Sequence, residues 1–335
     1  MRKLTVLALG VVSAVAFLAH LKAAGTGYHI LNEIKIGGEG GWDYLTVDSA
    51  ASRLYVSHAT HVVVVDLATG KVVGDIPETP GVHGIALAPE LNKGFISNGR
   101  GNNITIFDMK TLKATGTVAA EMNPDDICYD RGSQRVFAFN GRSRSATVVD
   151  AKNGTAAATI PLPGKPEFSV ADGKGHVYTN IEDTSEIVEI DAAKAVVTKK
   201  YALTGCEGPS GMAMDLKGRR IFSVCGNRVM AISDPDKGTV IATPPIGAGP
   251  DGVVFDPGTG YAMSSNGDGT LTIVQQSGGK YEVLENIATE RGARTIALDE
   301  KTHHVYLPTA TAGQAAAGGR APYLPDSFKV LVVGK

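Results

Sequence analysis

The chain has 335 residues, enough for one large domain or two ordinary ones, and its 32 basic and 34 acidic side chains give a net charge of −2. Because there is no basic excess, general affinity for the nucleic-acid backbone is not expected. The 41 glycines and the aromatic content of only 6% favour many short strands joined by tight turns over long helices.

The first 24 residues have the pattern of a secretory signal peptide. Arg2 and Lys3 precede an apolar run over 4–18 and small residues around 19–25. The run is shorter than the roughly 20 residues that span a bilayer, and no later stretch approaches that length. We therefore predict cleavage, a periplasmic or secreted location and no membrane span in the mature chain, with an uncleaved anchor as the alternative. The mature chain has 32 − 3 = 29 basic against 34 acidic residues.

After a single predicted strand over 28–37, a repeat of about 42 residues runs to the end of the chain. Its turn anchors are Asp48, Ala88, Asp130, Asp172, Asp215, Asp256 and Asp299, at steps of 40, 42, 42, 43, 41 and 43 residues. A large apolar residue follows six or seven positions after each anchor: Tyr55, Phe95, Phe137, Tyr178, Phe222, Met263 and Tyr306. The first unit predicts strands over 45–48, 54–57, 61–66 and 72–76. Four strands in a repeat of this length are typical of a β-propeller blade.

The predicted fold class is therefore all-β, a seven-bladed propeller of four-stranded blades that forms one domain over 25–335. The last repeat ends at 328–334 with only its third strand. We expect the N-terminal strand over 28–37 to supply the fourth, which closes the ring and removes two free edges.

Seven polar residues, five positions before the anchors, are predicted to ring the mouth of the central channel. They are Asp43, His83, Asp125, Glu167, Ser210, Asp251 and Arg294. One interpretation is that a wet channel mouth simply keeps these side chains hydrated. The other is a ligand or cation site, because crowded carboxylates ionise together more readily beside a cation. Oxygen ligands suit Ca²⁺ or Mg²⁺, and an added imidazole suits Zn²⁺. The candidate metal ligands are Asp43, His83, Asp125, Glu167 and Asp251.

A second set of positions follows the second strand of each blade, and its polar members are candidate ligand-binding residues. They are His58, Asn98, Asn140 and Asn266. Turn chemistry is the alternative explanation for the three asparagines, each of which precedes a glycine.

Cys206 and Cys225 fall in one repeat and are both expected on the mouth face. A disulfide is geometrically possible there, and two free thiols or a metal thiolate are the alternatives. Cys128 lies within an apolar strand and is expected to be a buried thiol. The segment 310–327, rich in Ala and Gly, is a loop insertion in the last blade and is interpreted either as a lid or as flexible surface.

Three motifs resemble a known repeat. Tyr55-Val-Ser-His58, Phe95-Ile-Ser-Asn98 and Phe137-Ala-Phe-Asn140 are similar to the Tyr-Val-Thr-Asn repeat of bacterial surface and periplasmic propellers. Over about 28–334 the chain resembles this YVTN-repeat, YncE-like family, although the fourth and fifth repeats and the last-blade loop depart from its pattern. The resemblance implies a seven-bladed periplasmic or secreted binding or scaffold protein, mostly without established catalysis.

The main functional hypothesis is an exported, monomeric binding or scaffold protein that holds a small ligand or protein partner at the channel mouth. The first alternative is a metal-dependent hydrolase or lactonase. In it, a divalent ion would activate water, His83 or a carboxylate such as Asp125 would be the general base, and Arg294 would stabilise the oxyanion. The second alternative is an accessory protein of a periplasmic redox system.

Overall fold

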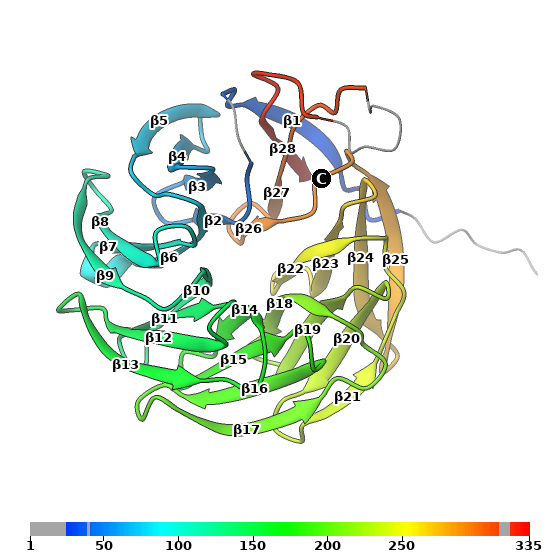
Figure 1. The fold of residues 1–335 in the computed structure, drawn as a ribbon. Coiled ribbons are helices and arrows are strands. Elements are labelled where there is room, and N and C mark those ends of the chain that lie inside the picture. Colours follow the sequence, from blue (N-terminus) through cyan, green and yellow to red (C-terminus); the bar gives the residue numbers. More distant parts are fainter. Residues whose placement is uncertain (1–24, 39–40, 315–321) are drawn as a thin grey trace, which may run out of the picture.

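The computed structural model describes residues 25–38, 41–314 and 322–335, so the predicted signal peptide over 1–24 lies outside the described residues. Seven sheets of four antiparallel strands are arranged as a ring (Figure 1). This confirms the predicted seven-bladed propeller.

Each blade runs from an inner strand at the channel to an outer strand at the rim. Blades 1 to 3 are β2(Leu45–Asp48), β3(Arg53–His58), β4(His61–Asp66), β5(Lys71–Ile76); β6(Val82–Ala88), β7(Lys93–Asn98), β8(Asn103–Asp108), β9(Ala114–Ala119); and β10(Pro124–Asp130), β11(Arg135–Asn140), β12(Ser145–Asp150), β13(Thr155–Pro161). Blades 4 and 5 are β14(Pro166–Ala171), β15(His176–Ile181), β16(Glu186–Asp191), β17(Val196–Ala202); and β18(Pro209–Asp215), β19(Arg220–Cys225), β20(Val229–Asp234), β21(Thr239–Ala242). Blades 6 and 7 are β22(Pro250–Asp256), β23(Tyr261–Asn266), β24(Thr270–Ser277), β25(Lys280–Ala288); and β26(Ala297–Asp299), β27(His304–Thr309), β28(Lys329–Gly334), β1(His29–Lys35).

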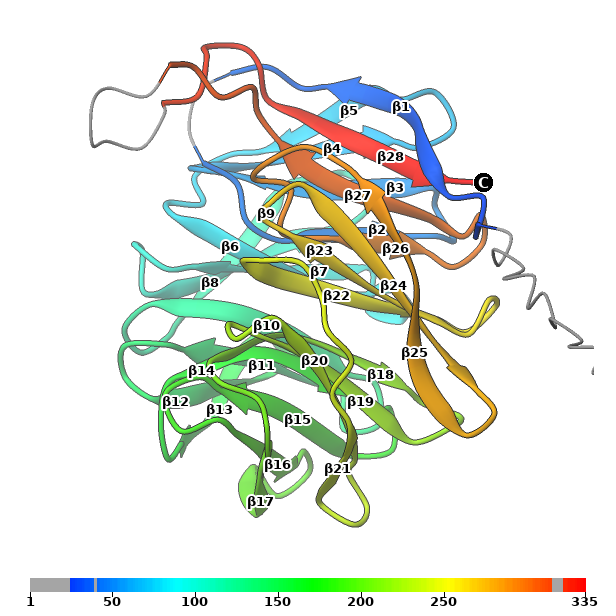
Figure 2. The same cartoon turned by 90° about the vertical axis from the view of Figure 1, so that its right-hand side faces the viewer.

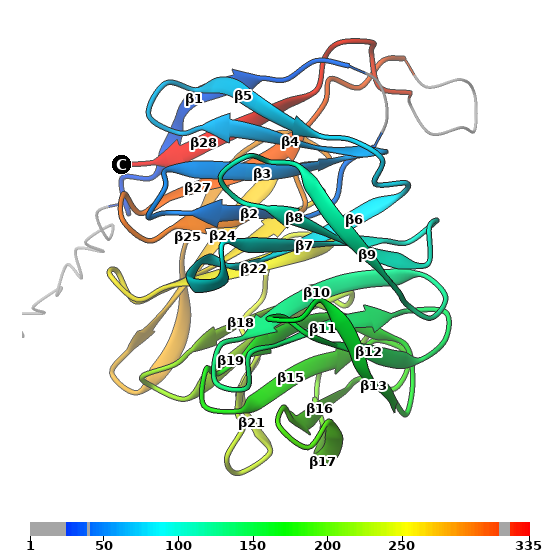
Figure 3. The same cartoon turned by 90° about the vertical axis from the view of Figure 1, so that its left-hand side faces the viewer.

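The N-terminal strand closes the ring as predicted. β1 pairs antiparallel with β28, from His29 opposite Gly334 to Lys35 opposite Lys329. The start of the described chain and its C-terminal end lie on one face of the ring, and the loop between β27 and β28 extends from the other (Figures 2 and 3). Both ends of the described chain therefore lie away from the mouth face.

The anchors of the repeat hold the turns between the first and second strands. The carboxylate of Asp48 accepts a hydrogen bond from the Ala51 amide at 3.0 Å, and that of Asp130 accepts one from the Ser133 amide at 2.7 Å. Such side-chain to backbone bonds stabilise tight turns. The second repeat has Ala88 as its anchor, and there the short 3₁₀ helix η1(Pro89–Leu91) makes the turn instead.

Apolar residues between adjacent blades form the core. Phe95 and Ile104 of blade 2, for example, pack with Val136 and Val149 of blade 3, and all four are fully buried. Burial of both faces explains the continuous Val and Ile runs of the strands, because no blade covers both of its faces alone. Among the described residues, no helix has the length and apolar character to cross a membrane.

Candidate ligand-binding site at the channel mouth

An aromatic contact spans the channel. Tyr44, just before β2, and Phe168 of β14 come from blades 1 and 4, yet their ring centroids lie 4.3 Å apart. The Tyr44 hydroxyl donates a hydrogen bond to Oδ1 of Asp125 at 3.3 Å. These blades are not neighbours in the ring, so the two side chains meet across the channel.

Three residues of the predicted ring form a compact cluster beside this contact. Nδ1 of His83 lies 2.6 Å from Oδ2 of Asp43 and 3.4 Å from Oδ1 of Asp125. One ligand atom from each of the three residues lies within 4.8 Å of the others. The backbone of Asp43 is fixed on both sides, because its amide donates to Ser57 at 2.8 Å and its carbonyl accepts from Thr295 at 2.6 Å. The cluster is thus a rigid part of three neighbouring blades.

Charge and burial oppose each other in this cluster. Burial lowers the pKa of His83, but the hydrogen bond to Asp43 and the negative charge of Asp125 outweigh it, so the net shift is upward. Burial raises the pKa of the Asp125 carboxyl, His83 opposes that shift, and Asp43 adds to it. An imidazolium between two carboxylates therefore offsets one of their two negative charges when no other cation is bound.

The structure brings three of the five predicted metal ligands together, and the other ring residues have partners outside the cluster. Arg294 holds Asp251, with Nη1 2.9 Å from Oδ2, and its Nη2 is 3.9 Å from Asp43. Burial raises the pKa of Asp251 to about 6 although Arg294 lowers it. Arg294 is already paired with Asp251, so it would have to leave that carboxylate to act as the oxyanion donor of the hydrolase hypothesis. Ser210 donates to the carbonyl of Pro250 at 3.3 Å.

Glu167 has its own cation, which the sequence did not reveal. Nζ of Lys165 lies 2.6 Å from Oε1 of Glu167 and also pairs with Glu182. Burial raises the pKa of the Glu167 carboxyl, and Lys165 opposes that shift. Most blades have Gly at the position of Lys165. The Lys in place of Gly was the one feature of the sequence that could have indicated this ion pair.

The second set of predicted residues belongs to the interior of the blades. Asn98, Asn140 and Asn266 are fully buried, and each side-chain amide donates to polar side chains of the neighbouring third strand. His58 is 2% exposed and stacks on Phe328 at 4.6 Å, and burial lowers its pKa to about 4. These four side chains tie hairpins together and do not line the mouth surface, contrary to the expectation that they contact a ligand.

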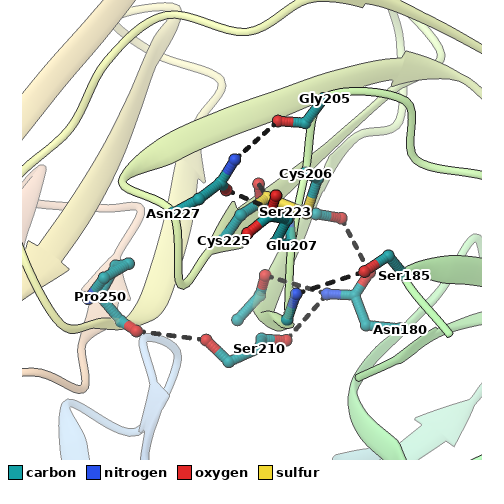
Figure 4. Close-up of a disulfide and its surroundings, with 12 residues drawn as sticks. Asn180, Ser185, Gly205, Cys206, Glu207, Ser210, Ser223, Cys225, Asn227 and Pro250 are labelled. Atoms are coloured by element: carbon teal, nitrogen blue, oxygen red, sulfur yellow. Dashed lines mark hydrogen bonds between the residues drawn. A yellow bond between two sulfur atoms is a disulfide. The ribbon is translucent and has the colours of Figure 1, made fainter. Parts of the chain in front are cut away.

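Cys206 and Cys225 form a disulfide (Figure 4). It joins the loop that enters β18 to the end of β19, and both residues are buried. Asn227 supports the same loop, because it accepts from the Glu207 amide and donates to the Gly205 carbonyl. The free-thiol and metal-thiolate alternatives therefore do not describe this pair. Cys128 is partly exposed, and burial of its sulfur raises the thiol pKa.

The last-blade loop is anchored at the mouth by a row of aromatic rings. Tyr323 lies 4.7 Å from Trp42, the residue before Asp43, and Trp42 stacks on Phe328 at 5.1 Å. The described part of the loop therefore lies beside the cluster, while residues 315–321 are outside the described chain.

Comparison with known proteins shows the fold alone. No family model matches the chain, and no curated protein matches it. Among solved structures it is similar to hydrazine synthase of Kuenenia stuttgartiensis, with a TM-score of 0.68, 15% identity and coverage of 88% of this chain and 96% of that one. It is also similar to a structure of U3-55K, with a TM-score of 0.73, 10% identity and coverage of 91% and 98%. Two such differently named neighbours agree with the rule that a propeller does not define an activity.

Proposed function

We propose that this protein is an exported ligand-binding propeller whose channel mouth binds a positively charged group of a small molecule or of a protein partner. One observation carries the proposal. The carboxylates of Asp43 and Asp125 converge on His83 beside the Tyr44–Phe168 contact, to which Asp125 is joined by the Tyr44 hydroxyl.

Burial separates this arrangement from ordinary surface charge. The side chains of Asp43 and Asp125 are only 18% and 17% exposed, so hydration alone compensates them poorly. A bound cation would lower the proton affinity that burial gives Asp125. The Tyr44 hydroxyl donates to Asp125 and so fixes the position of that carboxylate. Cation binding is therefore the role that suits the charge and the burial of the cluster.

Calorimetric titration with putrescine, an organic diammonium, tests this function. The Asp125→Asn variant is expected to bind at least about tenfold more weakly, since it loses a charged partner. Glu121→Gln is the matched control, because Glu121 is an exposed carboxylate in a mouth-face loop without an ion pair among the described residues. Equal affinity in Asp125→Asn and wild-type protein would place the binding elsewhere.

A metal-dependent hydrolase or lactonase is the second candidate, and the donor set favours it. One imidazole nitrogen and two carboxylate oxygens within 4.8 Å of one another suit a divalent ion. Such an ion would polarise a carbonyl and lower the pKa of a bound water. With His83 as a ligand, Asp251 becomes the candidate base, because its pKa of about 6 lies near neutrality.

Elemental analysis separates the two candidates. The hydrolase requires about one divalent ion per chain, its loss in Asp125→Asn, and metal-dependent cleavage of lactones or esters by the wild-type protein. Metal-free protein that shows no thermal shift with Ca²⁺ or Zn²⁺ would remove this candidate and leave the binding function standing.

Export and the resemblance to YVTN-repeat propellers are also part of the proposal. The disulfide between Cys206 and Cys225 supports an oxidising compartment. The start of the described chain lies on the face opposite the mouth (Figures 2 and 3). Cell fractionation with mass spectrometry tests this: the shortened chain should appear in the periplasm or medium. Full-length, reduced protein in the cytoplasm would contradict it.

A further inference from the structure

A second hollow lies on the mouth face beside the cation cluster. It is a cleft of about 640 Å³ between blades 6 and 7. Its walls come from the loops that enter β22 and β26, from the loop after β23, and from the last-blade loop, which contributes Ala312 and Tyr323. A volume of this size is in the range of small-molecule sites.

Glycines make the cleft possible. Gly249, Gly267 and Gly292 line it, one from each of three loops. Gly249 and Gly292 have φ of +63° and +88°, which other residues rarely adopt. A Cβ on Gly292 would lie 3.0 Å from the Tyr323 hydroxyl, and one on Gly267 would lie 3.0 Å from the Gly249 carbonyl. Side chains at these positions would fill the space between Tyr323 and the floor of the cleft.

Among the described residues, the charged groups of the cleft leave one cation without an ionic partner. Arg294 is paired with Asp251 at 2.9 Å. Asp268 accepts hydrogen bonds from the Ala248 amide at 2.6 Å and the Thr270 hydroxyl at 2.7 Å, so its oxygens are already occupied. Arg291 lines the cleft, is exposed, and has no carboxylate within 4.0 Å in the part of the chain that the structure describes. Its planar guanidinium can therefore take a carboxylate through two parallel hydrogen bonds.

We propose that this cleft binds a small organic carboxylate, with the carboxylate on Arg291 and the body of the molecule against Tyr323 and Pro250. Arg294 also lines the cleft, where its partner Asp251 offsets its charge. An apolar wall lies beside the guanidinium groups of Arg291 and Arg294. It is formed by Pro250, Ala248, Ala312 and the Tyr323 ring. A carboxylate with a ring-shaped body uses both features, whereas a bare inorganic anion uses only the charge. The proposal rests on the mouth-face binding function but not on the cation cluster, which Arg291 does not contact among the described ion pairs.

The chain carries its own reporter for this site. Trp42 is the only tryptophan in the sequence, and its ring lies 4.7 Å from Tyr323. A molecule that packs against Tyr323 should change the emission of Trp42. Phenylacetate and glucuronate are the probes, and phenylacetamide is the uncharged control for the first.

Titration of the full mature protein with each carboxylate, followed by Trp42 emission and calorimetry, tests the proposal. At least one carboxylate should saturate one site, and phenylacetamide should bind at least about tenfold more weakly. Arg291→Gln should weaken binding by about tenfold or more, the effect of losing a charge-assisted pair. Arg142→Gln, which removes an exposed arginine from a blade 3 mouth loop, should leave the affinity unchanged.

A charge-neutral variant guards against a purely electrostatic effect. Ala312→Phe places a ring in the cleft from an exposed position and should abolish carboxylate binding without lowering the melting temperature. The proposal is overturned if neither carboxylate binds below 10 mM, or if Arg291→Gln binds as wild type does. Putrescine binding measured on the same proteins keeps this result separate from the mouth cation site: its persistence without carboxylate binding rejects the cleft alone.

Discussion

Asp126 lies beneath the mouth, and replacing it by asparagine should reduce the pH dependence of folding. The side chain is 6% exposed, and Ser169 donates a hydrogen bond to it. Burial raises the pKa of Asp126 to about 7, from an ordinary value of 3.8. The folded chain then holds this proton more tightly than the unfolded chain does. Its stabilising contribution is complete below the unfolded pKa and is lost as pH rises through the folded pKa.

The size of the effect follows from these two values. The difference between about 7 and 3.8, at about 1.36 kcal/mol for each tenfold change in proton affinity, gives about 4 kcal/mol at full ionisation. About half of it, ~2 kcal/mol, falls between pH 5.5 and pH 8. Asp126→Asn removes the ionisable group and keeps the shape of the side chain. Between pH 5.5 and pH 8, the free energy of unfolding of this variant should therefore fall by ~2 kcal/mol less than that of wild type.

Urea unfolding of wild type, Asp126→Asn and the exposed control Glu121→Gln at pH 5.5 and pH 8 provides the measurement. The free energy of unfolding of wild type and of Glu121→Gln should fall in parallel as pH rises. That of Asp126→Asn should fall less, so this variant becomes more stable relative to both. Parallel slopes for all three proteins would refute the burial argument.

Three further predictions concern the mouth. Cation binding should weaken as pH falls below the raised pKa of His83. The affinity should fall by up to about tenfold per pH unit if the imidazole must lose its proton for the cation to bind. A dissociation constant that does not change with pH in calorimetry would contradict this. Arg294→Gln should strengthen putrescine binding severalfold, because a positive charge 3.9 Å from Asp43 is removed; weaker binding would instead make Arg294 part of the ligand contact. Replacing Cys206 and Cys225 together by serine should lower the free energy of unfolding by about 3 kcal/mol, given their separation of 19 residues, and an unchanged urea midpoint would show that the disulfide is dispensable.

Sequence alone predicted the fold because its evidence is periodic. Anchors such as Asp48 and Asp130 recur at a nearly constant step. Each stabilises a turn through a hydrogen bond to a residue three positions later, so its role can be predicted from the local sequence. The predicted N-terminal strand had no partner in its own repeat, and the last repeat lacked a fourth strand. These two observations together predicted the pairing of β1 with β28. The same spacing identified the seven polar positions that include Asp43, His83 and Asp125.

The detailed geometry of the site depended on contacts that a repeat does not encode. Tyr44 and Phe168 meet across the channel from blades that are not neighbours, so no local pattern links them. Lys165 neutralises Glu167 from a position where most blades have Gly. The three asparagines after the second strands look like mouth residues in sequence, but their side chains turn inward to the adjacent strand. Cross-channel distance and side-chain direction therefore decided which polar residues form the site.

The most direct test of the central claim is calorimetric titration of wild-type, Asp125→Asn and Glu121→Gln protein with putrescine, Ca²⁺ and Zn²⁺ at pH 7.5. The account predicts that at least one of these cations binds wild type with a stoichiometry near one, that Asp125→Asn loses about tenfold or more in affinity, and that Glu121→Gln matches wild type. No binding by any of the three cations, or equal binding by Asp125→Asn, would contradict the assignment of the channel mouth as a cation-binding site.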